Sequence, residues 1–199
     1  MPRHTLPMHQ VLFPRATPAF QDAQDRTPTD HAVLGLDLSL TGSAAVVLPK
    51  GWNPSAPWTA ISFQRFGEQG ALRGQERTSA IVHAVWKLAV REGVTKAFVE
   101  QYAFSFAPNA ITHVAELVGA IKETLHTSLK IETVPIVASS ARKLLFGKLP
   151  RMSRKETKAL IKSEFEKLGA PFPDEDTRDA FIVCNAARHT LGLPCLASG

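Results

Sequence analysis

The stretch from Val33 to Val47 reads V-L-G-L-D-L-S-L-T-G-S-A-A-V-V and constrains the fold more than any other part of the chain. It is apolar apart from one acidic residue, Asp37, and a break at Leu40-Thr41-Gly42-Ser43. A carboxylate inside an apolar strand is costly unless a partner or a cation neutralises it. We therefore expect two buried strands joined by a tight turn, with Asp37 beside a bound divalent metal ion.

The rest of the chain has the pattern of a mixed α/β domain. Apolar runs bounded by Gly, Pro and Asn predict strands, and apolar residues at helical spacing predict helices. The expected strands are Ala32–Leu38, Ser43–Leu48, Thr59–Phe66, Lys96–Gln101 and Glu132–Val137. The expected helices are Gln75–Glu92, Asn109–His126, Ser139–Phe146, Ser153–Leu168 and Asp174–Leu191, and Ser153 with Glu156 has the spacing of a capping box.

The order of these elements predicts one domain built on a five-stranded sheet. Three strands with short connections form an antiparallel meander, and two later strands join in parallel beside the first strand, which must then be central. We expect this domain to span residues 31–192. A flexible, proline-rich tail precedes it over residues 1–30, and a C-terminal tail follows over residues 193–199. The first tail lacks a secretory signal, and an organelle-targeting role for it stays open.

Composition narrows the environment of the protein. No apolar run approaches the roughly 20 residues that span a bilayer, so we expect no membrane partner. Cys184 and Cys195 are not spaced like a metal-ligand pair or a disulfide framework, which favours a reducing compartment. Our expectation is the cytoplasm of a bacterial or virus-infected bacterial cell.

The basic residues are concentrated between Arg142 and Lys162. This stretch has eight Lys and Arg residues and one acid, Glu156, so its net charge is +7, whereas the whole chain carries +5. A solvated helix face usually mixes both signs, so the excess favours a surface for a polyanion such as nucleic acid. The candidate DNA-binding cations are Arg142, Lys143, Lys148, Arg151, Arg154, Lys155 and Lys158.

Four acids form the candidate chemical site. Asp37 lies in the first strand, Glu100 ends the fourth, and Asp176 and Asp179 share one face of the last helix. Neighbouring carboxylates repel unless a cation lies between them, and all-oxygen ligands favour Mg²⁺ or Mn²⁺. Four carboxylates match a two-ion site for phosphodiester hydrolysis. The alternatives are a solvated Glu100 and helix capping by the acids at the start of the last helix.

Four motifs in this order resemble the RuvC family of Holliday junction resolvases. They are G-L-D-L-S-L-T-G (35–42), F-V-E-Q-Y-A-F (98–104), A-R-K-L-L-F-G (141–147) with S-R-K-E-T-K (153–158), and D-T-R-D-A-F (176–181). The similarity extends from about Val33 to Leu191. It implies a ribonuclease H-like fold and a dimeric endonuclease.

The resemblance also implies roles for individual residues. Asp37, Glu100, Asp176 and Asp179 would be the catalytic and metal-binding acids, while Arg142 and Lys155 would contact the junction backbone near the scissile phosphate. An aromatic residue on the loop after Glu100 would touch bases at the crossover, and the candidates are Tyr102, Phe104 and Phe106. Ordinary packing beneath the loop is the alternative for these three aromatics.

The predicted function is a structure-specific DNA endonuclease of recombination and repair that makes paired symmetric nicks in a four-way junction. Its cofactor would be Mg²⁺, two ions per site, with Mn²⁺ as a substitute, and no small-molecule cofactor is expected. Symmetric incision requires a homodimer, with the apolar stripe of the helix Asn109–His126 as the candidate interface and core packing as the alternative. A ribonuclease H acting on RNA–DNA hybrids and a non-cleaving junction-binding module are the competing functions. The chain is too short for a sugar-kinase or actin-like ATPase.

Overall fold

A computed structural model of the chain describes residues 31–39, 42–66, 74–101 and 108–197. The tail predicted over residues 1–30 lies outside the described residues. The strands are β1 (Val33–Asp37), β2 (Ala44–Leu48), β3 (Ser62–Arg65), β4 (Lys96–Gln101) and β5 (Thr133–Val137). The helices are α1 (Gly74–Arg91), α2 (Pro108–Leu129), α3 (Ala138–Phe146), α4 (Arg154–Lys167) and α5 (Glu175–Thr190), with a 3₁₀ turn, η1 (Trp58–Ala60).

The described strands form one sheet in the order β3-β2-β1-β4-β5. β1 pairs antiparallel with β2 and parallel with β4, and β5 extends the sheet in parallel. This is the predicted arrangement of three antiparallel strands followed by two parallel ones. Because β1 and β4 are parallel neighbours, Asp37 and Glu100 come to the same edge of the sheet.

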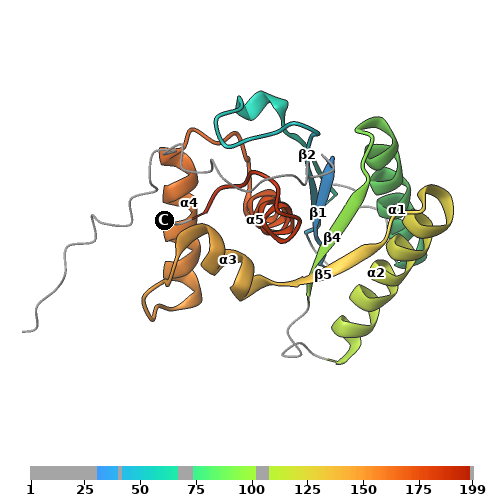
Figure 1. Cartoon of the computed structure of the whole chain (residues 1–199). Coiled ribbons are helices and arrows are strands. Elements are labelled where there is room, and N and C mark those ends of the chain that lie inside the picture. The colour runs from blue at the N-terminus through green and yellow to red at the C-terminus, as the bar shows by residue number, and fades with distance from the viewer. Residues whose placement is uncertain (1–30, 40–41, 67–73, 102–107, 198–199) are drawn as a thin grey trace, which may run out of the picture.

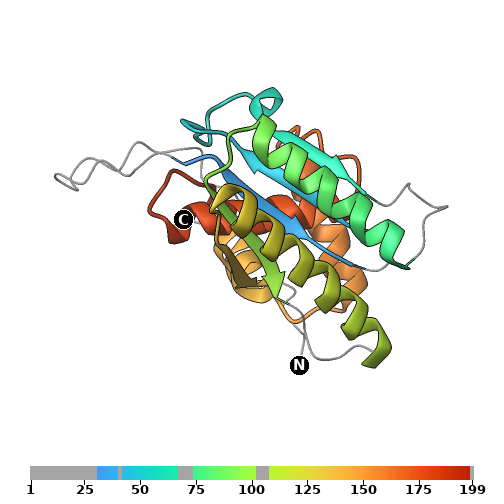
Figure 2. The ribbon, with the colours of Figure 1, turned by 90° about the vertical axis from the view of Figure 1, so that its right-hand side faces the viewer.

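Helices cover both faces of the sheet, giving three layers (Figure 1). Figure 2 shows α1 and α2 side by side on one face, while α3, α4 and α5 lie on the other. Side chains alternate along β1, so Leu34 and Leu36 pack in the core beneath α1 and α2. Val33 and Asp37 therefore face α5.

The backbone of helix α5 lies in close contact with β1 at Gly35. A Cβ atom at Gly35 would lie 2.5 Å from the Ala180 carbonyl oxygen and from the Cβ of Cys184. Glycine at this position of β1 allows the α5 backbone to approach the sheet. Phe181 of α5 anchors the same side by ring contacts with Trp58, Phe165 and Phe172.

Arg188, near the end of α5, is fully buried. Its guanidinium donates to backbone carbonyls of His31, Pro49, Trp52 and Pro194, and it lies over the Trp52 ring. One side chain therefore joins the start of the domain, the loop after β2 and the segment after α5.

Three sequence expectations differ from the structure. The strand predicted over Thr59–Phe66 begins at Ser62, because Trp58 packs on Phe172 and donates its indole N–H to the Leu168 carbonyl within a 3₁₀ turn. The second helix extends to Leu129, one turn beyond the predicted end. Part of the segment predicted as a C-terminal tail packs on the domain, since Leu193 is buried and Leu196 exchanges hydrogen bonds with Asn185.

The apolar stripe predicted as a dimer interface on α2 faces the core. Val114 and Ile121 are buried, and Val118 packs against the core beneath α1 and α2. The Ile111 side chain lies outside the described residues. Core packing, the alternative explanation, accounts for the stripe in the described part of α2. No described helix is long and apolar enough to cross a bilayer.

Candidate metal centre and basic surface

Three of the four predicted acids meet at one edge of the sheet. One carboxylate oxygen each from Asp37, Glu100 and Asp179 lie within 4.8 Å of one another. We call these three residues the acidic triad. Asp37 ends β1, Glu100 lies near the end of β4, and Asp179 lies on the first turns of α5, which crosses that edge.

Burial and mutual repulsion disfavour ionisation of the triad. Burial, reinforced by the charges of Glu100, Asp179 and Asp176, raises the pKa of Asp37 to about 8. Burial also raises the pKa values of Glu100 and Asp179, while Arg142 opposes the rise for all three carboxyls. A divalent cation would remove this penalty, because it would replace like-charge repulsion with attraction to each carboxylate.

The donor set of the triad fits a hard divalent ion. All three donors are carboxylate oxygens, the ligands that Mg²⁺ and Mn²⁺ prefer. Oxygens bound to one Mg²⁺ at about 2.1 Å lie at most about 4.2 Å apart. The observed limit of 4.8 Å is close to that requirement, so the three residues could hold one ion after a small adjustment.

Asp176 lies outside the triad. Its carboxylate lies close to Gly42. A Cβ atom added to Gly42 would be 2.8 Å from the Asp176 Cγ atom and closer still to one oxygen of that carboxylate. The charge of Asp176 nevertheless helps to raise the pKa of Asp37, so the two groups are electrostatic neighbours. Burial and Asp174 raise the pKa of Asp176, whereas Arg65 opposes the rise.

The loop between β1 and β2 is closed by its own serines. Ser43 Oγ accepts from the Ser39 N–H and donates to the Ser39 carbonyl oxygen, both at 3.0 Å. Ser39 Oγ accepts from the Gly42 N–H at 2.9 Å and donates to the Gly42 carbonyl. The loop returns β2 beside β1, as predicted for the Gly42 turn. It also contacts the Asp176 carboxylate through Gly42. Leu40 and Thr41 lie outside the described residues.

The acids at the start of α5 have different roles. Asp174 is the N-cap, since its Oδ1 accepts from the Thr177 N–H at 2.8 Å, and it also pairs with Arg65 of β3 at 3.3 Å. Glu175 pairs with Lys158 of α4. Helix capping, the alternative expected for the acids at the start of the last helix, therefore explains Asp174. The ion pair of Arg65 with Asp174 could not be predicted from the sequence, because β3 and α5 are far apart in the chain and meet only in the fold.

The predicted basic residues lie on α3, α4 and the loop between them, and some of them act on the triad. Arg142 of α3 donates from Nη2 to Asp179 Oδ2 at 3.3 Å, and the positive charge of Arg154 opposes the raised pKa of Glu100. Ser153 and Glu156 form the predicted capping box, which fixes the start of α4. The remaining predicted cations are exposed and form no ion pair with a described acid; they are Lys143, Lys148, Arg151 and Lys155.

The aromatic candidates Tyr102, Phe104 and Phe106 lie outside the described residues. Their assignment to base contacts stays a prediction.

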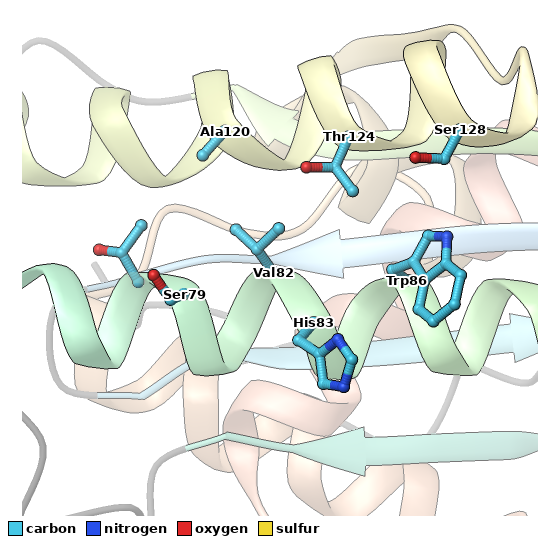
Figure 3. A pocket seen from close by; sticks show the side chains of 8 residues that line it. Ser79, Val82, His83, Trp86, Ala120, Thr124 and Ser128 are labelled. Carbon is cyan, nitrogen blue, oxygen red and sulfur yellow. The ribbon is translucent and has the colours of Figure 1, made fainter.

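A separate groove of about 490 Å³ lies between α1 and α2, on the face of the sheet opposite α5 (Figure 3). Val82, His83 and Trp86 line it from α1, and Ala120, Thr124 and Ser128 line it from α2. No carboxylate lines this groove, so it is not a second candidate metal centre.

The sheet order, the two helical layers and the acids at the ends of β1 and β4 define a ribonuclease H-like fold. No protein-family model matches the chain, and no curated protein matches it in sequence.

Solved structures show the same fold. The chain is similar to RuvC of Thermus thermophilus, with 16% identity, a TM-score of 0.58, and coverage of 81% of this chain and 96% of that one. The same protein in complex with a Holliday junction substrate gives 15% identity, a TM-score of 0.59 and the same coverage. The yeast mitochondrial Holliday junction resolvase Ydc2 gives 15% identity, a TM-score of 0.49, and coverage of 78% of this chain and 76% of that one. The likeness to RuvC confirms the fold that the four motifs predict.

Proposed function

We propose that this protein is a metal-dependent endonuclease that resolves four-way DNA junctions. The observation that carries the proposal is the meeting of Asp37, Glu100 and Asp179 within 4.8 Å at one edge of the sheet, with Arg142 paired to Asp179. The fold is that of RuvC, whose structure with a Holliday junction substrate gives a TM-score of 0.59. The acidic triad and the cations of α3 and α4 would supply the two parts that a nuclease site needs.

The acidic triad would hold one Mg²⁺ ion, and Asp176 with Asp37 would contribute to a second. A bound ion would activate water and neutralise the charge that develops on the phosphate, and Mn²⁺ would substitute for Mg²⁺. The residues of the chain would place the DNA. Exposed cations on α3, α4 and the loop between them neutralise phosphates without reading bases. Arg142, beside the triad, is the nearest cation for the phosphate that is cut.

Paired symmetric nicks require two such sites related by a two-fold axis, so we propose a homodimer. Light scattering on the purified chain would give its mass against the 21.7 kDa expected of a monomer. A monomer at the concentration that supports junction cleavage would contradict paired incision by a stable dimer.

The central experiment offers the protein a labelled four-way junction and an RNA–DNA hybrid in parallel over a titration of Mg²⁺. We expect two symmetric nicks in the junction. Cleavage of the hybrid without the junction would assign a ribonuclease H, and tight junction binding without cleavage would assign a binding module.

Glu100→Gln tests the site itself, with Glu132→Gln as the matched control. Glu132 is exposed and precedes β5, at the opposite end of the sheet from the triad. We expect Glu100→Gln to lower cleavage by at least about 100-fold and to keep junction binding, because cations rather than Glu100 contact phosphates. Undiminished cleavage by Glu100→Gln would refute the assignment.

A further inference from the structure

Arg142 makes the ion pair that directly contacts the acidic triad in the described structure. Its Nη2 atom lies 3.3 Å from Asp179 Oδ2, and the two side chains are 31% and 16% exposed. Arg142 projects from α3, which follows β5, and β5 pairs with the strand that carries Glu100. The guanidinium therefore reaches the triad from the sheet edge that α5 crosses.

Two of the neighbouring cations are paired with other acids, whereas Arg154 forms no ion pair with a described acid and acts on the triad only through its charge. Lys158 pairs with Glu175 and Arg65 pairs with Asp174, and neither acid belongs to the triad. Three carboxylates thus share one directly paired cation among the described residues. An ion at the centre of the triad would share the Asp179 carboxylate with the guanidinium and would be repelled by its positive charge.

We propose that Arg142 is the internal counter-ion of the metal-free centre, and that a divalent ion must displace it from Asp179 in order to bind. The inference rests on the proposed metal site. The displaced guanidinium would then be free to contact a phosphate oxygen. Binding of the ion would in this way free the Arg142 guanidinium for contact with DNA. By linkage, DNA binding would increase the affinity for the ion.

The proposal makes a prediction about metal affinity that is opposite to a purely structural role for Arg142. Loss of a cation that competes with the ion tightens ion binding, whereas loss of a structural support weakens it. We expect R142Q to bind Mn²⁺ about three- to tenfold more tightly than the original protein in the absence of DNA. R142K, which keeps the charge, should stay within about twofold of the original affinity.

Isothermal titration calorimetry of the full chain with Mn²⁺, without DNA, measures these affinities. K162Q is the control, because Lys162 pairs with Glu166 on the exposed side of α4, 3.7 Å away, and its loss removes the same charge. We expect K162Q to bind Mn²⁺ like the original protein. R142Q that is folded by circular dichroism and binds Mn²⁺ no more tightly would overturn the proposal.

A second measurement uses the unaltered protein and does not depend on how R142Q folds. In a crystal structure with Mn²⁺ located by its anomalous signal, the Arg142 and Asp179 side chains should be more than 4 Å apart. A loaded centre that keeps their ion pair would overturn the displacement. If the original protein binds no Mn²⁺ and D37N gives the same calorimetric titration, the proposed metal site itself is wrong. That outcome is distinct from a metal site that binds Mn²⁺ without displacing Arg142.

Discussion

The carboxylate of Asp176 rests against the backbone of Gly42. A Cβ atom at Gly42 would lie 2.8 Å from the Asp176 Cγ atom, closer than the 3.0 Å below which real Cβ atoms are essentially never found. Asp176 therefore occupies the space that a side chain at position 42 would need, and the loop between β1 and β2 helps to place an acid of α5.

Gly42→Ala should displace the Asp176 carboxylate while leaving the fold intact. Misplacement of a group in a site by about 1 Å can cost up to about 100-fold in rate. We expect cleavage of a four-way junction to fall by at least about tenfold, with little change in the free energy of unfolding. Gly42→Ala combined with Asp176→Asn should be no less active than Asp176→Asn alone, because both changes act on the same carboxylate.

Gly119→Ala is the control for this substitution. Gly119 lies within α2, and a Cβ atom built there would have no neighbour within 4 Å. The change should leave cleavage unaltered and stabilise the protein by up to about 1 kcal/mol, because glycine is a poor helix former. Equal loss of activity in both glycine variants would show that the effect is not specific to Asp176.

Gly35→Ala should lower stability through the contact between β1 and α5. The new Cβ atom would lie 2.5 Å from the Ala180 carbonyl oxygen and from the backbone nitrogen of Cys184, and these backbone atoms can move only if α5 moves. We expect the free energy of unfolding in urea to fall by about 1–3 kcal/mol. Mn²⁺ affinity should fall too, because α5 carries Asp179. An unchanged stability would show that the helix can shift freely.

The strands, and the acids that they carry, could be predicted because runs of apolar residues indicate a strand without reference to distant parts of the chain. Apolar runs predicted β1 and β4, and their parallel pairing brought Asp37 and Glu100 together. Contacts between distant segments left no such pattern. Arg188 is one example: its carbonyl partners lie as far back as His31, so nothing near Arg188 in the sequence indicates its burial. The position of Asp176 beside Gly42 rather than in the triad is another.

Stability of the metal-free protein should fall as pH rises. The pKa of Asp37 is raised to about 8 from an ordinary value near 4, so the folded state holds one more proton than the unfolded state between these values. The free energy of unfolding should therefore decrease by up to about 1.4 kcal/mol per pH unit from this group. The raised pKa values of Glu100, Asp176 and Asp179 act in the same direction.

Urea unfolding in EDTA at several values between pH 5 and 8 would measure this slope. Asp37→Asn removes the titrating group and should flatten the slope, and Mn²⁺ should stabilise the original protein more at pH 8 than at pH 5. Parallel slopes for the two proteins would contradict the raised pKa of Asp37.

Junction binding should depend on salt through the exposed cations of α3 and α4. Lys143 and Lys155 are exposed and form no ion pair with a described acid, so their charges are available to phosphates. Each phosphate contact contributes about 0.9 to the slope of log affinity against log salt. We expect the double variant Lys143→Gln and Lys155→Gln to reduce the magnitude of that slope by about 2.

Fluorescence anisotropy with a labelled four-way junction in Ca²⁺, over a series of salt concentrations, would give the slope without cleavage. Lys96→Gln combined with Lys130→Gln is the matched control, because both lysines are exposed and lie at the end of the sheet opposite the triad, where Lys96 begins β4 and Lys130 precedes β5. The control should keep the original slope. If both double variants lower the slope equally, the dependence reflects the net charge of the protein, and the α3 and α4 surface has no special role in DNA binding.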